Sequence, residues 1–153
     1  MNQKPPLLVI DVDGVLNTRP GSLDTDKLKE LERIHASTLC CFLLSSSWRK
    51  TPRQFARIVE VLHARGIGLA DVTPDLDRSV NGLWQAQERW VEIEQWLLEH
   101  GDKYGNVIIL DDLPAMGPLS HLHVRTDPSE GLTHYLADVV ILRLSQNPQD
   151  KEL

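Results

Sequence analysis

Two aspartates separated by one residue follow a short apolar run near the N-terminus. The run Leu7–Ile10 leads directly into Asp11 and Asp13, and Gly14 comes next. Continuous apolar runs are typical of parallel strands that helices cover on both faces, and the ligands of such sheets bind beyond the carboxyl ends of the strands. A buried carboxylate pair is costly unless a cation or a reaction uses it. One carboxylate could align with a phosphorus atom while the other serves as an acid and a base, although Asp-Gly is also a common turn pair.

A second apolar run, Leu39–Leu44, ends in three serines. Hydroxyls and backbone amides at such a position can donate hydrogen bonds to phosphoryl oxygens. Ser45 is the first polar residue after the run and is the preferred contact, with Ser46 as the alternative. The same serines could instead cap the helix that follows.

A third apolar run, Val107–Leu110, ends in Asp111 and Asp112. Magnesium prefers hard oxygen ligands, often one or two carboxylates together with water and phosphate. These two acids therefore predict a Mg²⁺ site, provided that their strand ends at the same edge of the sheet as the strand before Asp11. The alternative is a helix cap or a solvated turn before Pro114.

Strand-like and helix-like segments alternate along the chain, which predicts an α/β fold with a doubly wound, mostly parallel sheet flanked by helices. In that arrangement Asp11, Ser45 and Asp111 each lie at the carboxyl end of a strand. Residues 74–86 carry mixed signals and are expected to form a loop. The expected strands are 7–10, 39–44, 68–72, 107–110 and 122–124. The first expected helix starts near residues 24–26, and three further helices are expected over 51–66, 87–100 and 132–144.

The size and composition are those of an ordinary globular protein. The chain has 153 residues, 41% of them hydrophobic and 25% charged, which predicts one domain, 1–153, with a real core. No run approaches the roughly 18 apolar residues of a membrane span, and the N-terminus lacks the apolar core of a signal peptide. Cys40 and Cys41 are adjacent and poorly placed to bridge each other, so a reducing, cytoplasmic location is expected. The net charge of −6 disfavours a protein coated in basic residues but allows a local basic patch.

The first motif resembles that of the haloacid dehalogenase (HAD) phosphohydrolase superfamily, which is an apolar strand followed by Asp-x-Asp-Gly. Residues 11–17, DVDGVLN, fit that motif at every position. The serines after the second run are similar to the second motif of the superfamily, and Asp111 and Asp112 are similar to its fourth. The resemblance implies a HAD-like Rossmannoid fold and a Mg²⁺-dependent phosphatase in which Asp11 forms an aspartyl-phosphate and Asp13 is the acid and base. Asp11 and Asp111 would bind Mg²⁺ directly, Asp13 through its carbonyl group, and Asp112 through water.

The resemblance also implies a basic residue that neutralises the nucleophile and the phosphate, on or before the helix that precedes the strand ending at Asp111. No lysine lies between residues 75 and 102. Arg89 is preferred, because a branch of small HAD-like proteins has a similar stretch with a basic residue shortly before Glu-Ile-x-x-Trp-Leu. Arg78 is the alternative, and Arg89 could also be a surface arginine that pairs with Glu92.

Too few residues separate the motifs for a separate cap domain, and an open site suits an extended substrate. Related small HAD-like domains are associated with RNA repair, so family analogy implies a nucleotide or a phosphorylated nucleic-acid end as the substrate, with no membrane partner. The alternatives are a phospho-receiver-like module and a catalytically silent HAD-like regulatory or binding module.

Three arginines spaced by four residues follow the second motif. On one helix, Arg49, Arg53 and Arg57 would form a basic stripe, with Lys50 beside the first of them. The stripe could bind phosphates beyond the reacting one, and Arg49 could contact the substrate itself. The alternative is an ordinary solvated helix face.

Overall fold

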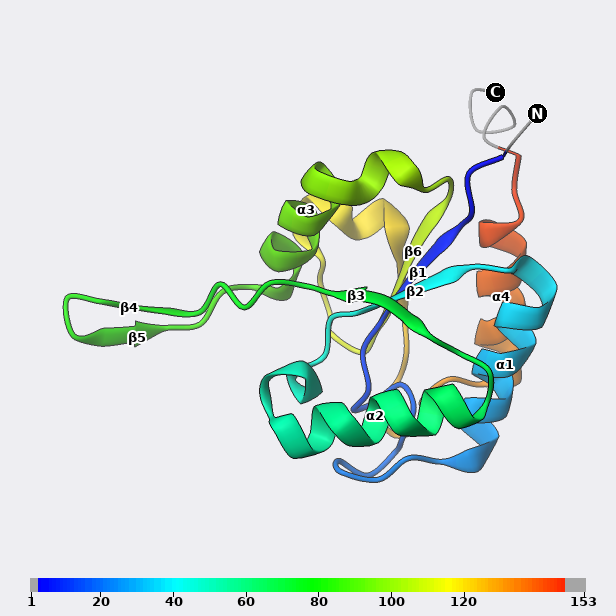
Figure 1. Ribbon diagram of the computed structural model, residues 1–153, viewed down its shortest axis with the longest axis horizontal. Coiled ribbons are helices and arrows are strands. Elements are labelled where there is room, and N and C mark those ends of the chain that lie inside the picture. The colour runs from blue at the N-terminus through cyan, green and yellow to red at the C-terminus, as the bar shows by residue number, and fades with distance from the viewer. Residues whose placement is uncertain (1–2, 148–153) are drawn as a thin grey trace.

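A parallel sheet of five strands forms the centre of the protein. The computed structural model describes residues 3–147. The strands lie in the order β3-β2-β1-β6-β7, and every neighbouring pair is parallel (Figure 1). Their bounds are Leu7–Ile10 for β1, Cys41–Leu44 for β2, Leu69–Val72 for β3, Val107–Asp111 for β6 and His123–Arg125 for β7.

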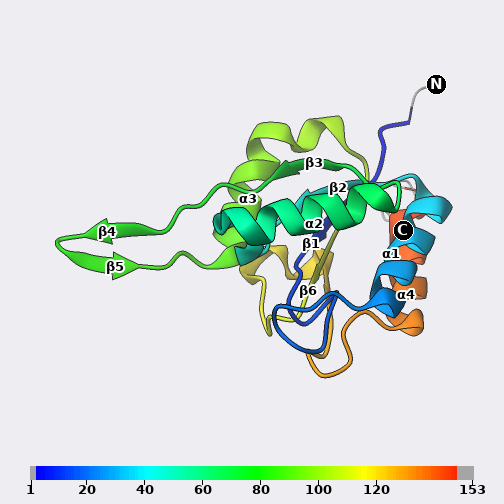
Figure 2. The same ribbon diagram turned by 60° about the horizontal axis from the view of Figure 1, so that its bottom comes forward.

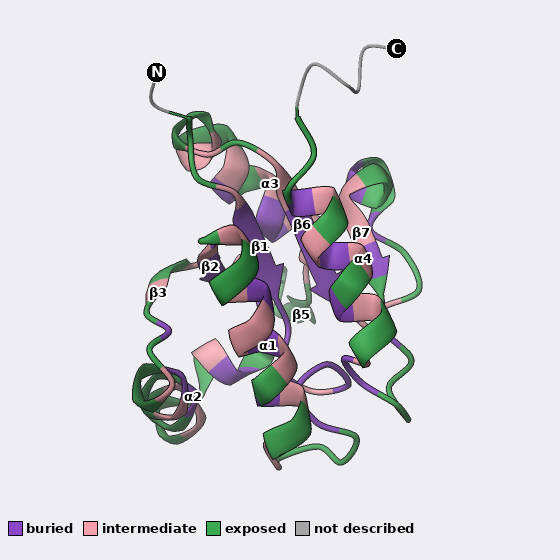
Figure 3. Cartoon of the chain, turned by 90° about the vertical axis from the view of Figure 1, so that its right-hand side faces the viewer, coloured by how far each residue is buried: buried purple, intermediate pink, exposed green. Residues whose placement is uncertain are grey.

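The strand β1 is central because all four of its side chains are apolar and fully buried. It pairs with β2 on one side and with β6 on the other. Successive side chains of a strand point to opposite faces, so Leu8 and Ile10 join one hydrophobic core while Leu7 and Val9 join a second. Figure 3 shows these strands as the buried interior between exposed helix surfaces.

Helices cover both faces of the sheet, as expected for a doubly wound fold. The larger core packs against α1 (Thr25–Thr38), α2 (Pro52–Ala64) and α4 (His134–Leu144). The smaller core packs against α3 (Arg89–His100) and the short 3-10 helix η3 (Gly117–Leu122). The expected α/β class and the lack of a separate cap domain are confirmed for the described residues.

The segment expected to be a loop contains a β-hairpin instead. Strands β4 (Arg78–Val80) and β5 (Leu83–Gln85) form a separate two-stranded antiparallel sheet. Asn81 and Gly82 join them with φ angles of 54° and 77°, as a two-residue hairpin turn with two positive φ angles requires. The prediction missed this Asn-Gly signal because the flanking strands are only three residues long. Figures 1 and 2 show the hairpin projecting well clear of the rest of the fold.

One element boundary and one additional short helix differ from the expectation for local backbone reasons. Leu39 ends α1 in a left-handed conformation with φ 55°, so β2 begins at Cys41. A 3-10 helix, η1 (Ser47–Lys50), precedes α2, which starts with Pro52 at its first position. Arg49 therefore lies outside α2. No helix in the described part of the chain is long and apolar enough to cross a membrane.

Candidate active site

Three carboxylates meet at the carboxyl ends of two neighbouring strands. Asp11 follows β1, Asp111 ends β6, and Asp112 comes next. Oxygens of the three side chains all lie within 4.8 Å of one another. Asp11 and Asp111 are buried, and Asp112 is half-buried. The register that pairs Ile10 with Leu110 explains this convergence, because the residues after them end at the same level.

Arg89 provides the positive charge for this cluster. Its Nη1 lies 3.0 Å from Asp11 Oδ2 and 2.8 Å from Asp111 Oδ2. Burial raises the pKa of Asp11 to about 7, and the charge of Asp111 adds to this rise, while Arg89 opposes it. Burial alone would lower the pKa of Arg89, but the two carboxylates raise it above its ordinary value. Arg78, the alternative basic residue, is exposed on β4.

Asp13 is oriented by three hydrogen-bond donors. Trp48 donates from Nε1 to Asp13 Oδ2 at 3.1 Å. The other carboxylate oxygen accepts from Asn17 Nδ2 at 2.8 Å and from the Gly21 amide at 3.2 Å. Two of these donors lie in the loop between β1 and α1 and the third lies on η1, so the carboxylate has a defined direction.

The glycine of the first motif is needed for both its conformation and its size. Gly14 has φ 81°, and a Cβ atom there would lie 2.4 Å from Asp112 Oδ2. Side chains rarely adopt that φ, and no carboxylate could stay so close to a methyl group. Thr126, next to β7, donates from Oγ1 to the Gly14 carbonyl at 2.6 Å. This hydrogen bond joins the loop after β1 to the segment that follows the edge strand β7.

The two serines after β2 are buried and already make contacts with the protein. Ser45 donates from its hydroxyl to the Ile10 carbonyl at 3.2 Å. Ser46 accepts from the Trp48 amide at 3.1 Å, so it caps η1. The capping alternative therefore applies to Ser46, while Ser45 ties β2 to the residue before Asp11.

The guanidinium of Arg49 is held by the protein through four hydrogen bonds to backbone carbonyls and one ion pair. Its Nε donates to the Thr73 carbonyl at 3.0 Å, and its Nη1 donates to the carbonyls of Ser45 and Ser46 at 3.0 and 2.9 Å. Its Nη2 donates to the Pro74 carbonyl at 3.1 Å and lies 2.9 Å from Glu92 Oε1. The side chains of Arg49 and Glu92 are each 4% exposed. We infer that Arg49 is a structural clamp, a role that argues against the expected substrate contact.

The expected basic stripe does not form. Arg49 lies on η1 and is buried, and Arg53 is exposed on α2. Arg57 donates from Nη1 to the Gly21 carbonyl at 2.6 Å, with its guanidinium carbon 5.8 Å from the ring centre of Trp48. Arg57 thus contacts the loop and the aromatic side chain behind Asp13, and the three arginines do not form one continuous cationic surface.

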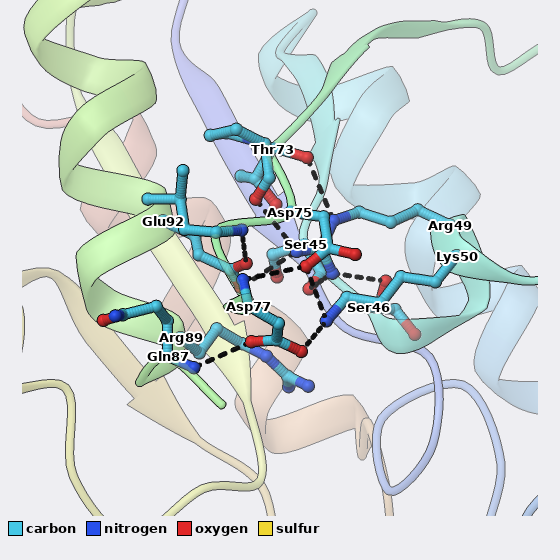
Figure 4. A network of polar contacts seen from close by, with 12 residues as sticks. Ser45, Ser46, Arg49, Lys50, Thr73, Asp75, Asp77, Gln87, Arg89 and Glu92 are labelled. Atoms are coloured by element: carbon cyan, nitrogen blue, oxygen red, sulfur yellow. Dashed lines mark hydrogen bonds and ion pairs between the residues drawn. The ribbon is translucent and has the colours of Figure 1, made fainter. Parts of the chain in front are cut away.

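A cavity of about 500 Å³ lies beside Arg89, between η1 and the start of α3. Lys50, Asp77, Gln87 and Glu92 are among its lining residues. A second acidic group, Asp75, Asp77 and Glu92, lies at this cavity. Lys50 Nζ is 3.3 Å from Asp75 and 2.7 Å from Asp77, while Glu92 pairs with Arg49 (Figure 4). Two protein cations pair with these three acids, whereas the three carboxylates around Asp11 share one arginine.

The parallel sheet with aspartates at the ends of β1 and β6 defines a HAD-like phosphohydrolase fold. More narrowly, residues 7–137 match the family described as the HAD domain in Swiss Army Knife RNA repair proteins, and the chain belongs to that family. No curated protein and no solved structure matches the chain. The resemblance stated from the motifs is confirmed.

Several residues that shape the site were not anticipated from the sequence. Trp48 and Thr126 carry no local signal for their contacts with Asp13 and Gly14, since each partner is distant along the chain. Asn17 was part of the recognised motif, and its position four residues after Asp13 could have suggested a hydrogen bond. Glu92 was considered only as a surface partner of Arg89, whereas it binds Arg49.

The clamp role of Arg49 predicts a large loss of stability on substitution. Removing one partner of a buried ion pair costs about 3–5 kcal/mol, because the other charge stays buried. Glu92→Gln should lower the free energy of unfolding by about 2–4 kcal/mol, measured by urea unfolding. Arg49→Lys keeps the charge but cannot reach all of the carbonyl groups that Arg49 binds, so it should also cost about 2–4 kcal/mol. Arg33→Lys is the matched control, since Arg33 pairs with Glu30 and Asp138 at the surface, where the cost should stay below about 1 kcal/mol. An Arg49→Lys variant as stable as the control would contradict the clamp.

Proposed function

We propose that this protein is a Mg²⁺-dependent phosphatase that acts on phosphorylated ends of nucleic acids through an aspartyl-phosphate intermediate. The observation that carries the proposal is the meeting of Asp11, Asp111 and Asp112 with a single arginine at the strand ends. The family description adds the nucleic-acid substrate, since it names RNA repair proteins.

The donor set around Asp11 fits a magnesium ion. Three carboxylates supply hard oxygen ligands, and their charge exceeds that of Arg89. Asp11, Asp111 and Asp112 would hold the ion, together with the carbonyl group of Asp13. When bound, Mg²⁺ would lower the repulsion between the carboxylate of Asp11 and a phosphate dianion.

The side chains of the site account for both steps of the proposed reaction. Asp11 attacks phosphorus, the bond from phosphorus to the ester oxygen breaks, and Asp13 gives its proton to the leaving oxygen. In the second half Asp13 takes a proton from water, the water oxygen attacks phosphorus, and the bond to Asp11 breaks to release phosphate. Arg89, next to Asp11 Oδ2, stabilises the negative charge on the phosphoryl oxygens.

Ser45 is proposed as the hydroxyl that donates to a phosphoryl oxygen. For that contact its hydroxyl would turn away from the Ile10 carbonyl, which also accepts from the Ser45 amide and so keeps a partner. Ser46 remains the second candidate because its oxygen accepts from Trp48, which leaves its own proton to donate. Activity assays of Ser45→Ala and Ser46→Ala distinguish the two.

The nucleophile is tested with Asp11→Asn. The amide has nearly the same shape but is a poor nucleophile, so turnover of an aryl phosphate should fall by at least about a thousandfold, or roughly 4 kcal/mol in the barrier. Asp13→Asn should also lose activity but should still allow the phosphorylated enzyme to accumulate from a substrate with a good leaving group. Mass spectrometry after acid quenching detects that species. Wild-type turnover by Asp11→Asn would overturn the covalent mechanism.

The metal site is tested by binding as well as by activity. At a hundred times its dissociation constant Mg²⁺ should stabilise the fold by about 2.7 kcal/mol, which raises the unfolding temperature by several degrees. Asp111→Asn and Asp112→Asn should weaken this shift. Asp75→Asn is the matched control, because Asp75 belongs to the second acidic cluster and already pairs with Lys50. A rise in the unfolding temperature that depends on Asp75 instead would place the ion at the second acidic cluster and contradict the proposal.

The hydrogen bond from Trp48 is tested with Trp48→Phe. The change removes the Nε1–H that orients Asp13 and should lower kcat about tenfold, since a hydrogen bond to a charged group is worth roughly 1.5–3 kcal/mol. Trp96→Phe is the matched control, because Trp96 Nε1 donates to Asp71 Oδ2 at 2.8 Å on the other side of the fold. Both variants should lose stability, but only Trp48→Phe should change kcat. Equal kcat values for both variants would remove Trp48 from the positioning of Asp13.

A further inference from the structure

The β4–β5 hairpin projects clear of the body (Figures 1 and 2), and it exposes two large apolar side chains. Leu83 and Trp84 are each 70% exposed. Trp84 pairs with Ser79 and Leu83 with Val80, so Trp84 and Leu83 lie on opposite faces of the hairpin. A two-stranded hairpin is only marginally stable by itself in water. An exposed tryptophan on this small hairpin therefore indicates a binding surface.

The charge of the hairpin differs from that of the rest of the chain. Residues 78–87 contain one charged side chain, Arg78, and no carboxylate, although the whole chain has a net charge of −6. The other polar groups of this segment are hydroxyl and amide groups. An arm with a cation, amides and a solvent-exposed tryptophan complements a phosphate backbone with unpaired bases.

The base of the hairpin continues into the candidate active site. Asp77 accepts from the Gln87 amide at 2.7 Å and from Lys50 Nζ at 2.7 Å, which joins the two ends of the hairpin to η1 (Figure 4). Asp77, Gln87 and Arg89 line the same cavity. A strand that leaves the carboxylate cluster through this cavity would reach the hairpin next.

We propose that the β4–β5 hairpin binds single-stranded nucleic acid, with Trp84 stacking on an unpaired base of the strand whose phosphorylated end lies at Asp11. This inference rests on the proposed phosphatase function and names the element that recognises its substrate. Stacking tolerates any base, since every base has an aromatic face, so the hairpin would select for single strands rather than for sequence.

A second copy of the chain fits this surface less well. An aromatic side chain buries at most about 250 Å², so Leu83 and Trp84 from two copies together provide under about 1,000 Å². Stable interfaces bury about 1,200–2,000 Å² in total. The three-residue strands β4 and β5 add little more by edge pairing.

The reach of the hairpin sets the length of strand that it can contact. Arg89 lies five positions after Trp84, so their Cα atoms are at most roughly 18 Å apart. Stacked nucleotides repeat about every 3.4 Å along one strand, which puts the base at Trp84 within about five nucleotides of the phosphorylated end. A mononucleotide would be too short to reach it.

The test measures the binding of fluorescently labelled oligonucleotides of one to ten nucleotides with a terminal phosphate, by anisotropy. Asp11→Asn serves as the background so that no turnover occurs. Adding Trp84→Ala should weaken binding of the longer single strands about tenfold and leave the mononucleotide unchanged, and Trp84→Phe should restore most of the affinity. Leu98→Ala is the matched control, because Leu98 is 77% exposed on α3. A blunt duplex should show no effect of Trp84→Ala.

Equal affinities of the Trp84→Ala and Leu98→Ala proteins for single strands would overturn the proposal. So would a dimer in light scattering, or binding to anionic vesicles, that depends on Trp84 while oligonucleotide affinity does not. Hydrolysis of a small aryl phosphate, measured in the wild-type background, should be unaffected by Trp84→Ala. If the wild-type protein hydrolysed no phosphate ester, the proposed function would fail, but the anisotropy measurement would still decide the role of the hairpin.

Discussion

Repulsion among the carboxylates of Asp11, Asp111 and Asp112 is the constraint on which the rest of the site depends. Their oxygens lie within 4.8 Å of one another, and burial strengthens the repulsion because fewer water molecules screen it. Arg89 is the protein cation that contacts two of them. Since one positive charge cannot balance three negative charges, the arrangement favours a second cation, and it also requires that Arg89 be held in place accurately.

Arg89 is held by the helix that it begins, and that helix is held by Arg49. Glu92 lies one turn after Arg89 on α3 and pairs with Arg49, which also binds carbonyl groups at the ends of β2 and β3. A single buried guanidinium thus links the serine loop, the sheet edge and the helix that carries the site arginine. An arginine suits this position because its planar head presents five N–H groups in fixed directions, whereas lysine offers three donors at one point. The same contacts explain why Arg49 is unsuited to binding a substrate.

The elements that local patterns define were predictable from the sequence, and the long-range contacts were not. A run of four or five apolar residues followed by a polar residue predicts a buried strand and places the polar residue at its carboxyl end. Asp11, Ser45 and Asp111 could therefore be placed together at the carboxyl ends of the parallel strands. The hairpin was missed because its strands are too short to show alternation and only Asn81-Gly82 marks it. The role of Arg49 depends on Glu92, 43 positions further along the chain. The residue pattern around Arg49 does not reveal that a separate 3-10 helix, η1, precedes α2 and turns Arg49 inward.

The described residues contain no cap and include a projecting hairpin, and both features leave the site accessible to an extended substrate. The second half of the proposed reaction consumes water, so the site gains little from being sealed once Arg89 and the acids are in position. A cap large enough to enclose the site would also exclude a polymer, whereas an arm that projects from the sheet edge can contact a chain of any length (Figure 2). The base of the hairpin lines the same cavity as Ser47 and Arg89, so a strand bound along the arm can lead into the site. A small hairpin can therefore select an extended substrate without involving the carboxylates that carry the chemistry.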